Sequence, residues 1–222
     1  MIRVHIICEG QTEESFIKEL LAKQFESREL YFYPTLIGTQ FHKGGNIKAD
    51  RLLYALKARL LGDVGSYTST FFDYYGLPRD FPGRRDAEKQ SKIADKAACI
   101  QNELVSYLEK QLGHDITQRF IPYVQMHEFE GLLFSDPTNF AEGLYKPDLA
   151  SKFESIRKQF PTPEDINDNY ETAPSKRIME LYPSYQKPLG GLQAACKVSI
   201  DTIRRECRLF NQWLVRLESL SS

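Results

Sequence analysis

The chain has 222 residues, of which 41% are hydrophobic and 27% are charged, and its formal net charge is −1. This composition is ordinary for a globular domain and excludes an intrinsically disordered chain. A net charge so close to zero also excludes whole-molecule attraction to nucleic acid, so such binding would need a local basic patch.

The lengths of the apolar runs and the spacing of the cysteines exclude further classes of protein. The apolar runs are only a handful of residues long, too short for a membrane-spanning helix. The start, Met1-Ile2-Arg3, does not resemble a signal peptide, so we expect a cytoplasmic protein without membrane partners. The cysteines form no Cys-x-x-Cys pair, which argues against a zinc site or a disulfide framework.

The first predicted strand ends abruptly in acids. Val4 to Cys8 is an apolar run typical of a buried strand, and Glu9 and Gly10 follow it directly. Thr12 is the expected cap of the next helix, and Glu13 either complements the N-terminal helix dipole or joins Glu9 in a site. A carboxylate at the end of a strand is well placed to meet a ligand, because ligands of open α/β sheets bind there.

Strands and helices then alternate along the chain. Strands are predicted at 30–37, 67–72 and 120–124, and an amphipathic helix at 49–61 is closed by Gly62. Between them, Gly44 and Gly45 beside lysines favour a turn, since the spacing is not that of a Walker phosphate-binding loop. A long helix is predicted over 87–112 and ends at Gly113.

The remaining chain carries helical patterns separated by prolines and no strand signal. We therefore predict an α/β fold: a mostly parallel sheet of about four strands flanked by helices, with a helical C-terminal region packed on it. The predicted division places the α/β core at 1–136 and the helical region at 137–222.

Acidic residues follow three of the predicted strands. Glu9 follows the first, Asp73 the third, and Glu128 and Glu130 the fourth, so all could meet at one edge of a parallel sheet. Clustered carboxylates repel one another unless a cation compensates them, and Mg²⁺ or Mn²⁺ suits such oxygen ligands. Glu13 is a further candidate ligand in the same crevice.

His127 stands beside these acids, with a side chain that titrates near neutral pH. It could serve as a general acid or base, or it could be a hydrogen-bonded structural residue, which is the commoner use of a single histidine at the end of a strand.

Basic residues form two candidate phosphate-binding groups. The first follows Asp73, interleaved with tyrosine and phenylalanine, and the second lies in the C-terminal half; together they comprise Arg79, Arg84, Arg85, Lys89, Lys176 and Arg177. The alternative for the helical members is a solvated face with local ion pairs.

Several short motifs together resemble a known family. They are Cys8-Glu9-Gly10-Gln11-Thr12-Glu13, the run 72–78 (FDYYGLP) with 81–83 (FPG), the run 127–134 (HEFEGLLF), the run 163–167 (PEDIN) and the run 172–178 (TAPSKRI). A strand ending in Glu-Gly resembles the first motif of the Toprim fold. More closely, the chain resembles the bacterial domain-of-unknown-function family 4276, a Toprim-like group.

The resemblance implies a metal-dependent protein that cleaves phosphodiester bonds or transfers phosphoryl groups in bacterial anti-phage defence or DNA metabolism. It implies catalytic roles for Glu9, Asp73, His127, Glu128 and Glu130. Toprim-like nucleases are often encoded beside a separate ATPase, and this chain has no Walker motif of its own.

One departure keeps a second reading open. The usual Toprim pattern has Asp-x-Asp after the third strand, whereas this chain has Asp73-Tyr74-Tyr75. The alternative is therefore a non-catalytic module that binds nucleic acid, a nucleotide or a partner protein; an RNA-directed effector is a third possibility.

Overall fold

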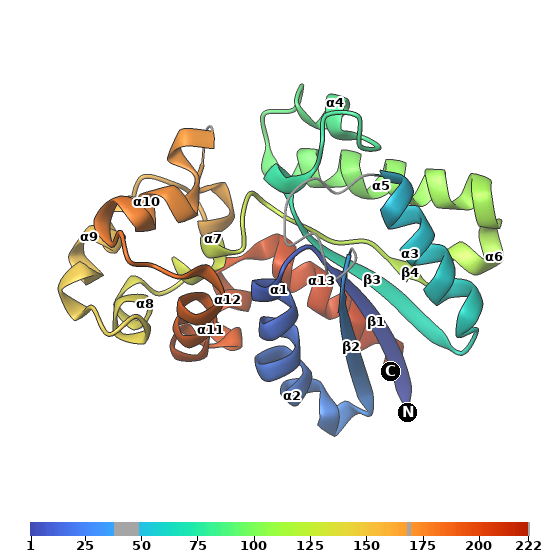
Figure 1. The fold of residues 1–222 in the computed structure, drawn as a ribbon, viewed down its shortest axis with the longest axis horizontal. Coiled ribbons are helices and arrows are strands. Elements are labelled where there is room, and N and C mark those ends of the chain that lie inside the picture. The colour runs from blue at the N-terminus through green and yellow to red at the C-terminus, as the bar shows by residue number, and fades with distance from the viewer. Residues whose placement is uncertain (38–48, 168–169, 222) are drawn as a thin grey trace. The chain divides into compact units, whose positions relative to one another are not determined.

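The computed structural model describes residues 1–37, 49–167 and 170–221, and it confirms the α/β class with a parallel sheet flanked by helices (Figure 1). The predicted turn at Gly44 and Gly45 lies outside the described residues. The strands are β1 (Ile2–Cys8), β2 (Leu30–Leu36), β3 (Ser66–Asp73), β4 (Phe120–Ile121) and β5 (Val124–Gln125).

The sheet has the order β2-β1-β3-β4, with β5 also paired to β3. β1 pairs in parallel with β2 on one side and with β3 on the other, so that Cys8 lies opposite Leu36 and Phe71. The chain thus moves outward from β1 to β2 and then crosses to β3 on the opposite side of β1. The connection order reverses between β1 and β3, which makes this the topological switch point of the sheet.

The longer connections are helical. The α-helices are α1 (Gln11–Phe16), α2 (Ala22–Phe25), α3 (Ala49–Gly62), α4 (Arg84–Ala87), α5 (Ile93–Leu112), α6 (His114–Thr117), α7 (Glu130–Leu133), α8 (Pro137–Gly143), α9 (Ala150–Arg157), α10 (Pro174–Leu181), α11 (Lys187–Val198), α12 (Ile200–Glu206) and α13 (Arg208–Glu218). Short 3₁₀ segments are η2 (Glu26–Arg28), η3 (Tyr74–Gly76), η4 (Pro147–Leu149), η5 (Pro163–Asp165), η6 (Tyr170–Thr172) and η7 (Ser219–Ser221), and η1 (Ile17–Leu21) is a π-helical segment joining α1 to α2.

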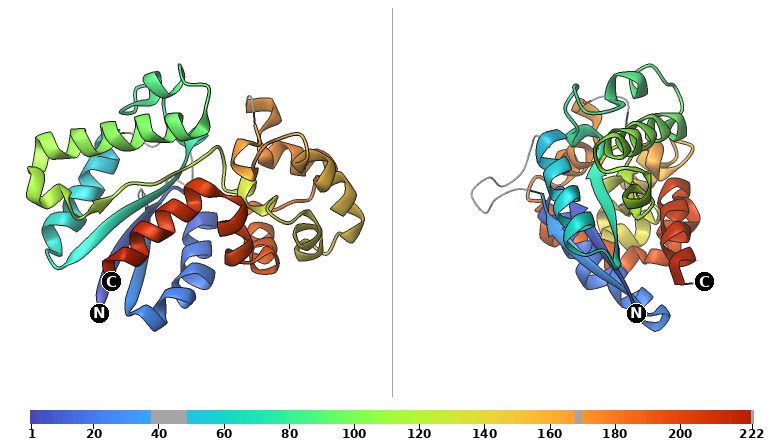
Figure 2. Two further views of the ribbon diagram at one scale, coloured as in Figure 1. Left: turned by 180° about the vertical axis from the view of Figure 1, so that it is seen from behind. Right: turned by 90° about the vertical axis from the view of Figure 1, so that its right-hand side faces the viewer.

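Contacts divide the chain into two compact units, residues 1–124 with 213–222, and residues 125–212. The predicted domain division at residue 136 stays a prediction. In the first unit, one face of β3 carries an aromatic core in which Phe71 contacts Phe16, Tyr123 and Trp213. The indole of Trp213 also donates to the Ser69 hydroxyl at 2.9 Å, so the last turns of α13 are fixed to this face of the sheet (Figure 2).

The second unit is helical and has its own core. Phe140 stacks on Phe153 with ring centroids 4.3 Å apart, and Phe134 packs edge-on against Phe140 at 5.2 Å. Gly143 lies so close to α11 that an added Cβ would stand 2.6 Å from the Cα of Ala194. Glycine at this position therefore allows α8 and α11 to pack backbone to backbone.

Several element boundaries differ from the prediction for local reasons. The strand predicted over 120–124 is interrupted by Pro122, which has no N–H for a ladder hydrogen bond. The helix predicted over 87–112 begins later, as α5 at Ile93; of its expected apolar stripe, Ala97, Ile100, Leu104 and Leu108 are buried and Ile93 is partly exposed. The expected Thr12 cap is wrong, because α1 already begins at Gln11 and Gly10 is its N-cap.

Candidate functional site

The acids predicted at the first and third strand ends lie next to each other in the first unit. Glu9 follows β1 and Asp73 ends β3, and these two strands are neighbours in the sheet. Their carboxyl ends frame the topological switch point, which is where open α/β sheets bind ligands. Sequence analysis identified both residues, and the sheet order explains why they meet.

A direct hydrogen bond joins the two positions. The backbone N–H of Asp73 donates to Oε2 of Glu9 at 3.2 Å, and the N–H of Glu9 donates to the carbonyl of Phe71 at 3.3 Å. The Glu9 carboxylate is thereby held across the end of β3 instead of extending away from the sheet. Both acids are half-buried.

Gly76 closes over the Glu9 carboxylate. A Cβ added at Gly76 would lie 2.2 Å from each carboxylate oxygen of Glu9, a distance no side-chain atom can occupy. The 3₁₀ turn η3 thus passes directly across Glu9, and only glycine permits that approach. Sequence analysis placed Gly76 in a loop, and its contact with Glu9 came only from the fold.

Glu13 belongs to the turn that follows Glu9. Its Oε2 accepts from the N–H of Gly10 at 3.0 Å, and the N–H of Glu14 donates to the carbonyl of Gly10 at 3.1 Å. The Glu13 side chain is buried. This geometry matches the helix-terminus interpretation of Glu13 and fixes the backbone that carries Glu9.

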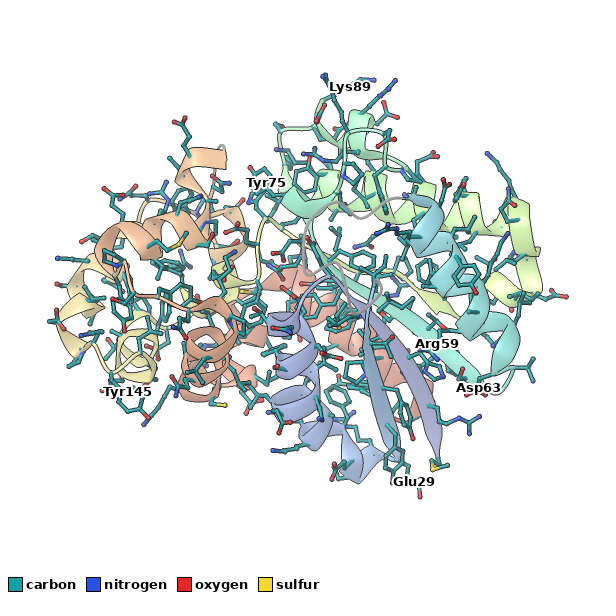
Figure 3. All side chains as sticks on the ribbon, in the orientation of Figure 1. Glu29, Arg59, Asp63, Tyr75, Lys89 and Tyr145 are labelled. Carbon is teal, nitrogen blue, oxygen red and sulfur yellow. The ribbon has the colours of Figure 1, made fainter. Side chains whose placement is uncertain are left out.

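Tyr74 and Tyr75 occupy the turn where the usual Toprim pattern would place the second aspartate. Their rings meet edge-on at 5.8 Å, and Tyr74 is buried. Tyr75 lies at the carboxyl end of β3 (Figure 3).

Arg84 secures the loop after Asp73. Its guanidinium lies 3.9 Å from the ring centre of Tyr74, donates to the Tyr74 hydroxyl, and is 3.3 Å from the Glu88 carboxylate. Burial is the main reason that the pKa of Tyr74 is raised, although the Arg84 charge opposes the rise. Arg84 therefore stabilises the loop through these contacts, which is an alternative to a role in phosphate binding.

Two of the other basic residues of this loop form ion pairs, and a third is exposed. Arg79 lies 3.5 Å from Glu88, and Lys89 lies 2.6 Å from Asp86 at the exposed position labelled in Figure 3. Arg85 is exposed on α4. These local pairs match the solvated-face interpretation for Arg79 and Lys89.

The acids predicted at the fourth strand end lie in the second unit. Oε2 of Glu128 accepts from the N–H of Ser175 at 2.9 Å, near the start of α10. Lys187, the first residue of α11, places its ammonium 3.6 Å from Glu128 and 3.5 Å from Glu130. One lysine thus compensates two carboxylates at the start of α7, Glu128 just before the helix and Glu130 as its first residue.

Burial is greatest at Glu130, which is 1% exposed, and His127 is also buried. Tyr185 lies nearby: burial first, and then the charges of Glu130 and Glu128, raise the pKa of its hydroxyl. Sequence analysis missed Lys187 and Tyr185, which are more than 50 residues from the acids and carry no motif. Whether His127, Glu128 and Glu130 meet Glu9 and Asp73 stays a prediction.

The second basic pair lies on α10 in the same unit. Arg177 donates to the Thr172 carbonyl at 2.8 Å and lies 5.3 Å from the ring centre of Phe160, which gives it a structural use. Lys176 is exposed.

Within residues 1–37, 49–167 and 170–221, no group of three or more histidine, cysteine, aspartate or glutamate side chains could hold a metal ion. Glu9 and Asp73 therefore contribute a pair of carboxylates at the switch point. Mg²⁺ is commonly held by one or two carboxylates with water and substrate phosphate completing its shell, so a pair fits that mode of binding.

Comparison with known proteins adds the family. No helix in the described part of the chain is both long and apolar enough to cross a membrane. No curated protein and no solved structure matches the chain significantly. Residues 8–218 match the family model described as "Domain of unknown function (DUF4276)", which covers nearly the whole chain. The chain therefore belongs to the DUF4276 family.

Proposed function

We propose that this protein cleaves phosphodiester bonds in nucleic acid, or transfers phosphoryl groups, with a divalent cation held by Glu9 and Asp73. The observation that carries the proposal is the pairing of these acids at the switch point, where the Asp73 N–H holds the Glu9 carboxylate across the end of β3. Rigid strand ends that present paired carboxylates suit phosphoryl chemistry, in which positioning and charge compensation supply most of the catalysis.

Mg²⁺ or Mn²⁺ is the cation that fits this pair. Oε2 of Glu13 accepts from the Gly10 N–H, so we assign the cation to the paired carboxylates of Glu9 and Asp73. Substrate phosphate oxygens and water would complete the coordination shell. Metal binding and substrate binding should therefore be coupled, each strengthening the other.

The chain's own groups have separate roles in this account. The Asp73 N–H orients the Glu9 carboxylate, and the absence of a side chain at Gly76 leaves room for that carboxylate beside η3. The Glu13 contact with Gly10 fixes the turn from strand to helix. A bound cation would stabilise the negative charge that develops on the phosphate.

The setting of this activity follows from the Toprim-like resemblance. We propose a cytoplasmic component of bacterial anti-phage defence or DNA metabolism, and a separate ATPase partner would supply any ATP dependence. Within the second unit, Glu128 and Glu130 share the ammonium of Lys187, and we propose a positioning role for both carboxylates there.

Tyr75 favours a second candidate function. It stands where the usual Toprim pattern supplies another carboxylate, and its ring instead packs on Tyr74. A non-catalytic module would use the same edge to bind nucleic acid, a nucleotide or a partner protein without cleaving anything.

A cleavage assay separates the two functions. Glu9→Gln and Asp73→Asn each remove one charge with little change of shape, and labelled single-stranded DNA, single-stranded RNA and duplex DNA serve as substrates with Mg²⁺, Mn²⁺ or EDTA. We expect metal-dependent cleavage by the wild type and a loss of about 100-fold or more in each variant, as when one electrostatic stabiliser of a transition state is removed.

The matched control is Glu29→Gln. Glu29 immediately precedes β2, at the opposite end of the strands from Glu9 (Figure 3), and it should retain full activity. Equal cleavage by wild type, Glu9→Gln and Asp73→Asn would refute the assignment. Failure of the wild type to cleave any substrate with either metal would favour the binding module.

A further inference from the structure

A groove of about 580 Å³ opens in the first unit beside β1, the strand that Glu9 follows. It lies between α3 and the carboxyl ends of β1 and β2. Its lining includes Ile7, Thr35, Tyr54, the two arginines Arg51 and Arg59, and one carboxylate, Asp50. No sequence motif marked any of them.

The groove follows from the sheet order. β2 is the edge strand, while α3 packs against β3 and β1, so part of the α3-side face of β2 remains open. Ala55 and Ala58 present only methyl groups to the groove. Tyr31 and Tyr33 alternate with Thr35 on this face of β2, and both are exposed.

Two exposed arginines of α3, Arg51 and Arg59, line the groove. Among the residues that the structure describes, neither has an ion-pair or hydrogen-bond partner. Figure 3 shows Arg59 on the side of α3 that faces the strands. Eight residues of helix separate the two by about 12 Å, so they can contact different phosphates of one strand. By contrast, Arg79, Arg84 and Lys89 are already paired.

Tyr54 lies between these arginines and is 78% exposed. An aromatic ring held in water between two arginines is a platform on which an unpaired base can stack. A paired base within a duplex does not offer its face to such a ring. The apolar groove floor beside Tyr54 would exclude water from a stacked base.

We propose that this groove binds single-stranded nucleic acid, with a base stacked on Tyr54 and phosphates held by Arg51 and Arg59. Ile7 lies in the groove two residues before Glu9, and the Cys8 carbonyl between them accepts from the N–H of Ile37 at 2.9 Å. A strand bound here would be led along β1 to Glu9. The inference rests on the proposed function for this last step and names its substrate class.

The experiment measures binding of a labelled, mixed-sequence single-stranded DNA oligonucleotide, and of the matching RNA, by fluorescence anisotropy in EDTA. EDTA removes divalent metal, so the readout is independent of cleavage. Two variants test the groove, Arg51→Ala with Arg59→Ala, and Tyr54→Ala. Circular dichroism and thermal melting confirm that each variant is folded.

The arginine double variant should lower the slope of log affinity against log salt by about 1.4, because each single-strand phosphate contact contributes about 0.7. Tyr54→Ala should weaken binding by about 5- to 150-fold. Tyr54→Phe retains the stacking face, so it should bind nearly as the wild type does. The matching duplex should bind more weakly than the single strand.

Two controls match these changes elsewhere in the chain. Lys18→Ala with Lys23→Ala removes the same charge from exposed positions on the first helical segment, which covers the opposite face of the sheet. Tyr145→Ala removes a tyrosine that is 77% exposed in the second unit. Neither should change the affinity or the salt slope.

The inference would be overturned if both groove variants kept the wild-type affinity and salt slope. It would also be overturned if the lysine control changed the affinity and slope as much as the groove variants do. Tighter binding of duplex than of single strand would also overturn it. The proposed function fails separately: if groove variants lose binding while Glu9→Gln still cleaves, the groove stands and the metal assignment falls. If the groove variants bind normally while Glu9→Gln is inactive, the metal assignment stands and the groove proposal falls.

Discussion

Gly76 leaves room for the Glu9 carboxylate because it has no side chain. The turn η3 passes so close to the Glu9 carboxylate that an added methyl group would lie 2.2 Å from both oxygens. A residue 67 positions away in the sequence therefore shapes the surroundings of the candidate metal ligand. Its effect can be tested without changing any acid.

Gly76→Ala should displace the Glu9 carboxylate and destabilise the protein by about 1–3 kcal/mol, the usual cost of overpacking. Chemical denaturation measures the loss. Gly62→Ala is the matched control, because nothing lies within 4 Å of a Cβ added at Gly62, and it should leave stability unchanged or slightly raised.

A double variant shows whether the clash is with Glu9 itself. In a Glu9→Ala background, Gly76→Ala should cost much less, because the carboxylate that meets the new methyl group is gone. An equal loss of stability in both backgrounds would mean that Gly76→Ala strains η3 for another reason. The close approach of Gly76 to Glu9 would then not explain the loss.

At the scale of elements, the boundaries that the sequence predicted well are those governed by periodicity. The stripe Ala97, Ile100, Leu104 and Leu108 predicted most of α5, and Gly113 ends it with φ of 84°. Pro122, by contrast, interrupts the strand predicted over 120–124, because proline lacks the N–H that a ladder needs. Local chemistry explains both features, although the prediction used it only for the helix.

Long-range contacts could not be predicted in the same way. The strand order that brings Asp73 beside Glu9 depends on which side of β1 each strand pairs, and no local pattern encodes that choice. Lys187 contacts Glu128 and Glu130 across more than 50 residues, and a lysine at the start of a helix has no distinctive signal. The groove beside Tyr54 likewise depends on β2 being an edge strand.

A single buried carboxylate accepts hydrogen bonds from the start of α13. Glu164 is 1% exposed, and its two oxygens accept from the N–H groups of Leu209 and Phe210, each at 2.9 Å. Burial raises the pKa of Glu164 to about 7, against the two hydrogen bonds, which favour the ionised form. The helix end is therefore coupled to pH.

The sign of that coupling follows from the raised pKa. Between about pH 4.5 and 7 the folded state keeps a proton on Glu164 that the unfolded chain releases, so stability should fall as pH rises through this window. The total change is on the order of 3 kcal/mol. Urea denaturation at several pH values measures it.

Glu164→Gln should flatten this pH dependence, because the amide does not titrate. It should also lower stability by about 1–3 kcal/mol, since its NH₂ group replaces one of the two acceptors at the helix start. The exposed Glu180→Gln should follow the wild-type curve. A Glu164→Gln curve with the wild-type slope would show that Glu164 is not the group responsible.

Across the whole molecule, the local distribution of charge matters more for nucleic-acid binding than the net charge does. A net charge of −1 gives no general attraction to nucleic acid, and several arginines and lysines are neutralised by neighbouring acids. Among the described residues of the first unit, the basic side chains outside ion pairs include Arg51 and Arg59 on α3 and Arg85 on α4. Binding, if it follows these residues, should be weak in high salt and confined to one side of the sheet.

The central claim is that Glu9 and Asp73 hold a divalent cation whose shell a substrate phosphate completes. Titration with Mn²⁺, followed by electron paramagnetic resonance of the free ion, tests it with and without a phosphorothioate oligonucleotide that resists cleavage. Two carboxylates alone should bind Mn²⁺ weakly, and the oligonucleotide should tighten binding by about 5- to 150-fold.

Wild type and Glu29→Gln should both show this coupled binding, and Glu9→Gln and Asp73→Asn should lose it while remaining folded. Neutralising one of two neighbouring carboxylates should not itself unfold the protein, because it removes repulsion. The account would be contradicted if Glu9→Gln bound Mn²⁺ as the wild type does, or if the wild type bound none even with the oligonucleotide present.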